Sequence, residues 1–548
     1  MRPPRHWEST RDKLANAIQE YEQAYSSLEI MLHMPVHKPF SRIIRSDFFT
    51  HVDWEVFTLH LYEERLEELR RRLSVARNTP RAPPPINTLP PEILVKIFSL
   101  ATQNWINEDY KETDVGQPAD GPCDLALVCT LWSRLVLRTP EFWTRISLAC
   151  AGIISQWSYR RSNAYAKRSQ GATLHVNFAG SERLNDIEPE ELSESDITRA
   201  IEFLTPLMHR VSSLAIYSGK CPADKLINPV LACWAQHSSI GVAKRLEIHG
   251  SIAVELPVSR VSPNTPNRLL PPRETSMLLA SLQAIRFNNV LFDWGFPLVY
   301  SSLTKLLLDF SFQLVPLPTQ CDIVNLLASN PGIRLLELYG IRVRPSTTYH
   351  AVAMDNLEVL GLQTRHANDL ALVLPLVSKA SDSVRMALSV GDSPEFTSAV
   401  RSFFARIKVT TLHINGPLPN TIESIAPLFT NMPDLRTLAI HSCDISGSIL
   451  NDLIRHYEVN SNSRDFWPNL RDLYVIRCLT SPHMARQLAN IHTLRKLWVY
   501  ETDLPAENEW NREGAPEEAK AALLERGVDL IWRRTKDRDI AQWSFVYI

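Results

Sequence analysis

One short apolar pattern recurs along most of the chain and constrains its fold more than any other feature. The pattern is apolar-x-x-apolar-x-apolar, and its clearest copies are Leu303-Leu306-Leu308, Ile333-Leu336-Leu338, Leu357-Leu360-Leu362, Val409-Leu412-Ile414, Leu435-Leu438-Ile440, Leu470-Leu473-Val475 and Leu494-Leu497-Val499. Weaker copies are Leu174-Val176, Val211-Leu214-Ile216, Leu246-Ile248, Leu282-Ile285-Phe287 and Met386-Leu388. From residue 306 onward, successive middle positions are 30, 24, 26, 26, 26, 35 and 24 residues apart. The pattern predicts short strands that present alternate side chains to one shared core.

Helical patterns fill the gaps between these copies, as at residues 422–429 and 449–457. Strand and helix in alternation resemble the leucine-rich repeat family, whose unit is a strand with a returning helix. The resemblance implies an α/β fold in which residues 151–548 form an irregular solenoid with inserted loops, one of them at 257–272. It also places Cys443 and Cys478 where the family has Asn or Cys, which implies buried structural thiols.

The first 85 residues have a different character. Residues 10–76 contain two heptad seams, namely Leu14, Ile18, Tyr21, Tyr25, Leu28 and Leu32, and then Leu59, Tyr62, Leu66, Leu69 and Leu73. These spacings predict coiled-coil-like helices, supported by ion pairs from Glu67 and Glu68 to Arg71 and Arg72. Pro35 and Pro39 separate the seams. We expect a helical hairpin packed within the chain, with a dimerising coiled coil as the alternative. A proline-rich stretch, 78–85, then predicts a linker.

A compact apolar module follows, at residues 86–150. Its landmarks are Leu89-Pro90, an apolar helix face of Ile93, Leu94, Ile97 and Phe98, the run Leu127-Val128-Cys129 with Trp132, and Pro140 with Phe142-Trp143. Thr88 is expected to cap the first helix, and the residues from Cys123 to Leu137 are expected to form the second. This segment resembles an F-box, in the version common in fungal proteins. The insert at about 101–122 is longer than the family's usual turn.

The F-box resemblance implies a small all-α module that docks on a Skp-type adaptor and, through it, on a cullin scaffold. Mapped onto this sequence, the expected adaptor contacts are Leu89, Pro90, Ile93, Leu94, Ile97, Val128 and Trp132. A repeat domain that follows an F-box commonly holds the substrate. We therefore expect the substrate-recognition subunit of an SCF-type E3 ubiquitin ligase. The alternative is a scaffold or protein-interaction module that keeps an F-box-like fold outside any ligase.

Strand alternation also predicts which side chains point away from the repeat core. With Leu473 and Val475 inward, Tyr474 faces outward, as do Trp498 and Tyr500 on the next copy. His413 and His441 are expected on the same outer surface. Grouped exposed aromatics suggest a patch that binds the substrate protein. The competing interpretation is that the C-terminal residues 523–548 fold over these side chains as a cap.

Composition excludes several classes of function. The 58 basic and 60 acidic side chains give a net charge of −2, which supplies no electrostatic reason to expect nucleic acid or membrane as a partner. The eight cysteines form no paired metal or disulfide spacing, and the sequence contains no recognised catalytic motif. We expect no enzyme activity, no cofactor and no metal. The N-terminal residues lack a signal peptide's apolar core, so an intracellular location, cytoplasmic or nuclear, is expected.

Overall fold

The computed structural model describes part of the chain, in the ranges that follow. They are residues 5–33, 58, 62–63, 65–73, 85–107, 121–149, 155–179, 193–219, 223–239, 241–255, 273–291, 300–310, 317–364, 366–391, 393–415, 432–441, 469–476, 493–501, 520–521 and 523–534. The chain divides into two compact units, residues 1–88 and 89–548. The predicted loop at 257–272, and Cys443 and Cys478 with their predicted buried thiols, lie outside the described residues.

The N-terminal unit is helical, as its heptad pattern predicts. Helix α1 spans Arg5–His33, residues 65–73 are helical, and the 3-10 helix η1 spans Pro85–Thr88. Glu68 accepts hydrogen bonds from Arg71 at 2.7 Å and from Arg72 at 2.8 Å. The described seam side chains, from Leu14 to Leu73, are 44–53 % exposed. The seams therefore do not pack as the expected hairpin among the described residues, and the dimerising coiled coil stays a prediction.

Three helices and a 3-10 turn open the second unit. They are α3 (Pro91–Asn107), α4 (Gly121–Val128), α5 (Thr130–Arg138) and η2 (Pro140–Trp143). The single second helix expected from Cys123 to Leu137 is wrong, because Cys129 is extended, at φ −160° and ψ 168°, and separates α4 from α5. Thr88 does not cap α3. Its hydroxyl donates to the Pro85 carbonyl at 2.6 Å and closes η1 instead. The expected insert begins as helix, through residue 107, and residues 108–120 lie outside the described ranges.

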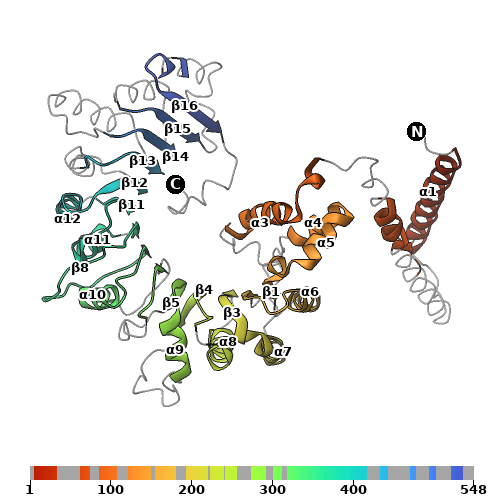
Figure 1. The fold of residues 1–548 in the computed structure, drawn as a ribbon, viewed down its shortest axis with the longest axis horizontal. Coiled ribbons are helices and arrows are strands. Elements are labelled where there is room, and N and C mark those ends of the chain that lie inside the picture. Colours follow the sequence, from red (N-terminus) through yellow and green to blue (C-terminus); the bar gives the residue numbers. More distant parts are fainter. Residues whose placement is uncertain are drawn as a thin grey trace. The chain divides into compact units, whose positions relative to one another are not determined.

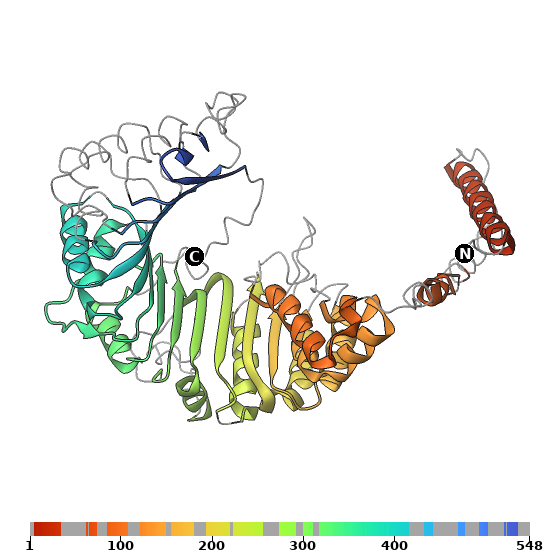
Figure 2. The ribbon, with the colours of Figure 1, turned by 45° about the horizontal axis from the view of Figure 1, so that its top comes forward.

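A long parallel sheet forms the rest of the unit (Figures 1 and 2). Its fourteen strands, in spatial order, are β1 (Arg145–Ala149), β2 (Leu174–Ala179), β3 (Val211–Gly219), β4 (Arg245–Glu255), β5 (Ala284–Leu291), β6 (Lys305–Asp309), β7 (Leu335–Tyr339), β9 (Val359–Gln363), β11 (Val384–Ser389), β12 (Val409–Asn415), β13 (Thr437–His441), β14 (Asp472–Ile476), β15 (Lys496–Glu501) and β16 (Asp529–Arg534). Two short strands, β8 (Val352–Ala353) and β10 (Val377–Lys379), pair separately. The predicted α/β architecture is confirmed.

The last two apolar positions of each predicted copy fall on a strand, and the register aligns them into two rows. The first row runs through Leu306, Leu336, Leu360, Met386 and Leu412, and the second through Leu308, Leu338, Leu362, Leu388 and Ile414. All of these side chains are buried, at 2 % exposure or less. The two end strands were not predicted from the sequence. β1 contributes Ile146 and Leu148 from within the F-box-like segment, and β16 lies in residues 523–548, for which a cap was one of two interpretations.

Helices return the chain along one face of the sheet (Figure 2). They are α6 (Ser155–Arg168), α7 (Glu194–Leu204), η3 (Thr205–Arg210), α8 (Ala223–His237), α9 (Arg273–Ser281), α10 (Gln320–Ser329), α11 (Ala367–Val373), η5 (Leu374–Leu376) and α12 (Pro394–Phe404). Local sequence explains several of their starts. Thr319 and Asp322 form a reciprocal capping box at α10. Ser393 caps α12, whose first residue is Pro394.

One aromatic cluster joins the opening helices to this sheet. The Trp143 indole donates a hydrogen bond to the Val136 carbonyl at 2.8 Å. Its ring meets Tyr165 of α6 edge-on, with centroids 4.9 Å apart. The Arg168 guanidinium lies 4.5 Å from the same ring, in cation–π geometry. Because β1 begins directly after Trp143 and pairs with β2, the opening helices and the repeats share one core.

Gly361 occupies a crowded position on the face of the sheet opposite the helices, which we call the outer face. A Cβ atom there would lie 2.9 Å from Glu337 Cγ and 3.4 Å from the Tyr339 hydroxyl. The absence of a side chain at Gly361 therefore makes room for the Glu337 and Tyr339 side chains.

We predict that Gly361→Ala destabilises the protein by about 1–3 kcal/mol, because the added methyl group displaces Glu337. The measurement is the thermal unfolding midpoint, which should fall by a few degrees. Gly332→Ala is the matched control, since its Cβ would lie 3.6 Å from its nearest neighbour. Equal midpoints for the two variants would contradict the prediction.

Candidate functional site

Helix α3 has two apolar stripes, and one of them faces solvent. The exposed stripe is Pro90, Ile93, Ile97 and Leu100, at spacings of 3, 4 and 3 residues, which places them on one side of the helix. Ile93 is 46 %, Ile97 36 % and Leu100 55 % exposed. Leu89, immediately before the helix, is 37 % exposed. The residues expected to contact an adaptor therefore lie largely on one accessible surface.

The other stripe of α3 consists of Leu94, Phe98 and Thr102, which are buried. Leu94 has no exposed surface and belongs to the main apolar core. The structure thus removes Leu94 from the candidate contact surface, because its side chain is used to pack the domain from within.

The second part of the exposed surface comes from the end of α4. Leu127 is 76 % and Val128 44 % exposed, beside the break at Cys129. Trp132 of α5 is half-buried and packs on Phe98, with ring centroids 4.5 Å apart. Sequence analysis missed Leu100 and Leu127. The 3-4-3 spacing from Pro90 would have identified Leu100, whereas the exposure of Leu127 depends on the helix break.

The outer face of the sheet is the second candidate surface. Near its C-terminal end, the Tyr474 and Trp498 rings stack 5.4 Å apart at an interplanar angle of 9°. Both side chains are half-buried and pack on Ile476, which is 1 % exposed. The Tyr500 side chain lies outside the described residues, although its backbone pairs with Ile476 in the sheet. The prediction that Tyr474 and Trp498 share one face is confirmed by this register.

The two histidines expected on the outer face are there, stacked on each other with ring centroids 5.6 Å apart. The expectation of exposure is wrong for His413, which is 3 % exposed, while His441 is half-buried. Burial, reinforced by the neighbouring His441, lowers the pKa of His413 to about 4. His413 is therefore a neutral, packed group at physiological pH.

A charged network lies on the outer face of β4 and β5. Glu247 forms an ion pair with Arg245, and its carboxylate lies 3.7 Å from His249 Nε2. Burial alone would raise the pKa of Glu247, but His249, Arg245 and Arg286 together lower it to about 2. The His249 ring also stacks on Tyr217, with centroids 4.6 Å apart. The carboxylate is thus held charged inside the sheet's outer layer.

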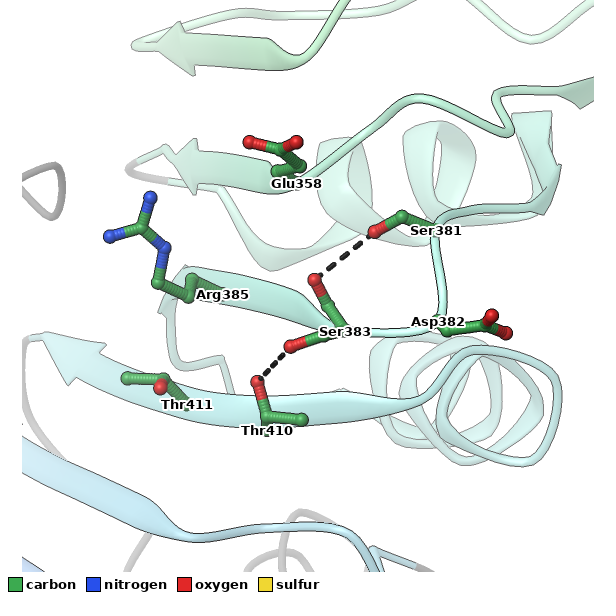
Figure 3. Close-up of a pocket in the computed structure, with 7 residues that line it drawn as sticks. All are labelled: Glu358, Ser381, Asp382, Ser383, Arg385, Thr410 and Thr411. Atoms are coloured by element: carbon green, nitrogen blue, oxygen red, sulfur yellow. Dashed lines mark hydrogen bonds between the residues drawn. The ribbon is translucent and has the colours of Figure 1, made fainter.

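A shallow pocket of about 460 Å³ opens at the amino-terminal ends of β9, β11 and β12 (Figure 3). It is lined by Glu358, Ser381, Asp382, Ser383, Arg385, Thr410 and Thr411. The register between β11 and β12 shifts after Val384, so that Thr410 is an extra residue, and its hydroxyl lies 2.9 Å from that of Ser383. Glu358 accepts hydrogen bonds from Arg334 at 2.6 and 3.0 Å. The pocket therefore offers hydroxyl groups and the Arg385 guanidinium, together with the carboxylates of Glu358 and Asp382.

Among the described residues, no group of three or more His, Cys, Asp or Glu side chains could hold a metal ion. The cysteines that the structure describes, Cys123, Cys129, Cys233 and Cys321, are free thiols. Within those same ranges, no helix is both long enough and apolar enough to cross a membrane.

A known protein family matches the segment that contains helices α3, α4 and α5. The F-box-like family matches residues 86–149, so the chain contains an F-box-like domain there. Among solved structures, the leucine-rich repeat-containing protein LegL7 from Legionella pneumophila is similar, with 13 % sequence identity and a TM-score of 0.29. That match covers 65 % of this chain and 93 % of LegL7. No curated protein matches the sequence.

We predict that Glu247 makes stability depend on pH in the acid range. Its pKa of about 2 in the folded protein is below the ordinary value of 4.5. The stabilisation is therefore complete above about pH 5 and is lost as the pH falls toward 2. The difference between these two pKa values sets an upper limit of ~3 kcal/mol on the contribution of Glu247 to the free energy of unfolding.

Thermal unfolding midpoints of the wild type and Glu247→Gln, measured from pH 7 to pH 3, test this. The variant should be less stable at pH 7, and the difference should shrink as the pH falls. Glu358→Gln, which breaks an exposed ion pair worth about 0–1 kcal/mol, is the control. A difference between wild type and Glu247→Gln that is constant across this range would refute the assignment.

Proposed function

We propose that this protein is the substrate-recognition subunit of an SCF-type E3 ubiquitin ligase and performs no chemistry itself. The F-box-like domain, which resembles the fungal type, binds a Skp-type adaptor and through it a cullin scaffold. The repeat domain, residues 151–548, binds the target protein inside the cell, in the cytoplasm or nucleus. The protein acts by raising the concentration of the target beside a ligase whose reactive thioester is on another subunit.

The observation that supports adaptor binding most directly is the exposed apolar surface of the F-box-like domain. Ile93, Ile97, Leu100, Leu127 and Val128 are each 36–76 % exposed within a segment of about 40 residues. Large apolar side chains exposed together on one small domain suggest a protein-binding site. Fully burying one such side chain contributes about 1.5–3 kcal/mol, so a few of them can hold a partner. Leu89, Pro90 and Trp132 complete the proposed contact surface.

We predict that Ile93→Lys with Ile97→Lys abolishes co-purification with a Skp-type adaptor, because each substitution places a charge in the apolar contact. The measurement is the amount of adaptor recovered with the affinity-purified chain after co-expression. Leu94→Lys is unsuitable as a test, since a charge at this buried position would unfold the domain.

The matched control is Met277→Lys with Leu524→Lys, which makes the same change at two exposed apolar residues of the repeat domain. It should retain the adaptor. A folded wild-type protein that fails to bind any Skp-type adaptor would overturn the proposal and favour a scaffold role outside the ligase.

Tyr474, Trp498 and Tyr500 are a second proposed contact with the target protein. We predict that Trp498→Ala with Tyr500→Ala lowers target capture while the unfolding midpoint falls by only a few degrees, since a stacked aromatic pair contributes about 0.5–1.5 kcal/mol. The midpoint is measured by differential scanning fluorimetry, and capture by target recovery in pull-downs. A midpoint loss of ten degrees or more would instead indicate that residues 523–548 cap the repeats through these side chains.

A further inference from the structure

The outer face of the sheet carries an unbalanced row of charges at the amino-terminal ends of its strands. In register from β1 to β11, this row contains four cations, Arg145, Arg245, Lys305 and Arg385. The positions between them are His175, Ser213, Ala284, Leu335 and Val359. We call these nine residues the basic row. It contains no acidic side chain.

The acidic groups of the same face do not neutralise the whole row. Glu247 is paired with Arg245 and lies near Arg286, so it offsets charge only on β4 and β5. Glu337 is buried, at 1 % exposure. The positive field is felt by His175, whose pKa is lowered first by its burial and then by the charges of Arg145 and Arg245. The nine positions of the row therefore carry net positive charge. Of the two carboxylates in the pocket at Arg385, Glu358 is hydrogen-bonded to Arg334 and Asp382 is exposed.

Lys305 and Arg385 are the two cations that remain available. Among the residues that the structure describes, neither side chain forms an ion pair. Lys305 is exposed, and Arg385 is half-buried at the pocket beside Thr411, its neighbour in register (Figure 3). A guanidinium with adjacent hydroxyl groups suits a carboxylate or phosphate, which accepts several hydrogen bonds at once.

The spacing of these two cations specifies what an occupant must look like. Three strand intervals separate β6 from β11, which at ~4.8 Å each give a span of ~14 Å. Leu335 and Val359 lie between the cations and are 6 % and 3 % exposed, in a small apolar cluster with the half-buried Leu307, so this part of the surface is apolar and uncharged. An extended chain rises ~3.4 Å per residue and presents residues i, i+2 and i+4 on one side, over ~14 Å. The match requires acidic groups at i and i+4 and an apolar side chain at i+2.

We propose that the stretch of the basic row from Lys305 to Arg385 binds an extended segment of the target protein with the pattern acidic-x-apolar-x-acidic. The acidic groups are carboxylates or phosphates. That the bound protein is a ubiquitination target rests on the function proposed above, whereas the binding itself follows from charge and spacing.

A protein segment fits this surface better than a nucleic acid does. Asp309 lies on the same face and Asp382 lies in the pocket at Arg385, and both would repel a continuous phosphate backbone. The basic row contains no Phe, Tyr or Trp on which unpaired bases could stack. Two cations separated by an apolar floor instead match a short segment with discrete charges.

The test measures binding of fluorescein-labelled peptides to the purified full-length protein by fluorescence anisotropy. The first peptide has glutamates at its first and fifth positions, leucine at the third and serine elsewhere. The second replaces both glutamates with phosphoserine, which distinguishes the two sources of acidic groups. A spacing control moves the second glutamate to the fourth position, where it points to the opposite side of an extended chain.

Lys305→Glu with Arg385→Glu should weaken binding at least ~10-fold, the effect of ~1.4 kcal/mol. Lys167→Glu with Arg401→Glu, at exposed positions of helices α6 and α12, makes the same charge change and should bind as the wild type does. Ile93→Lys with Ile97→Lys should lose the adaptor and keep the peptide, which separates the two proposals.

The inference is overturned if neither the glutamate nor the phosphoserine peptide binds, or if the spacing control binds equally well. It is also overturned if both charge-reversal pairs weaken binding alike, or if a single-stranded RNA of equal length binds more tightly than either peptide. Loss of peptide binding in a protein that still recovers the adaptor would leave the ligase role intact.

Discussion

The structure of residues 89–548 depends on two parallel rows of apolar side chains held in register by backbone hydrogen bonds between strands. Each strand contributes one residue to each row, such as Leu336 and Leu338 from β7. No single repeat can bury these side chains alone, because a lone strand and helix leave both flanks open to water. Each repeat is therefore stable only against its neighbours. The same register also aligns the side chains of the outer face into rows, so the packing of the core also orders the outer face.

Most of this sheet could be predicted because its signal is local and repeated. The apolar pattern at Leu435-Leu438-Ile440 needs no knowledge of the rest of the fold, and it falls on β13. For the two end strands, the neighbouring residues hid this apolar pattern. Ile146 and Leu148 follow directly on Phe142 and Trp143, so their apolar character was absorbed by the helical module. Leu530 and Trp532 of β16 lie in residues 523–548, which were interpreted as a possible cap and not as a strand, because terminal repeats depart from the internal pattern.

On the candidate surfaces, sequence periodicity does not predict which side chains are exposed. Alternation correctly places His413 on the outer face, but its burial depends on the neighbouring His441 ring, which only the sheet register brings there. On α3, Leu94 and Ile97 are equally apolar, and only the position of Trp132 and α5 decides which one is buried. Cys129 interrupts a continuous helical pattern without glycine or proline, and the sequence contains no local signal for that break. The sequence thus predicts on which face of a helix or strand a side chain lies. Whether that side chain is exposed depends on how the helices and strands pack against one another.

The continuity at Trp143 has a consequence for how a bound protein would be presented. The indole ring ties the F-box-like helices to α6 through Tyr165 and Arg168, and the next residues enter the sheet as β1. The distance from β1 to any later strand is then set by the number of strands between them, since each one adds ~4.8 Å along the sheet. Five intervals separate β1 from β6, or ~24 Å, and three more reach β11, at ~38 Å along the same path. Adding or deleting a repeat would lengthen or shorten that path by one strand interval while leaving both proposed contact surfaces unaltered. The number of repeats therefore sets the distance between the F-box-like helices and a protein bound to the sheet.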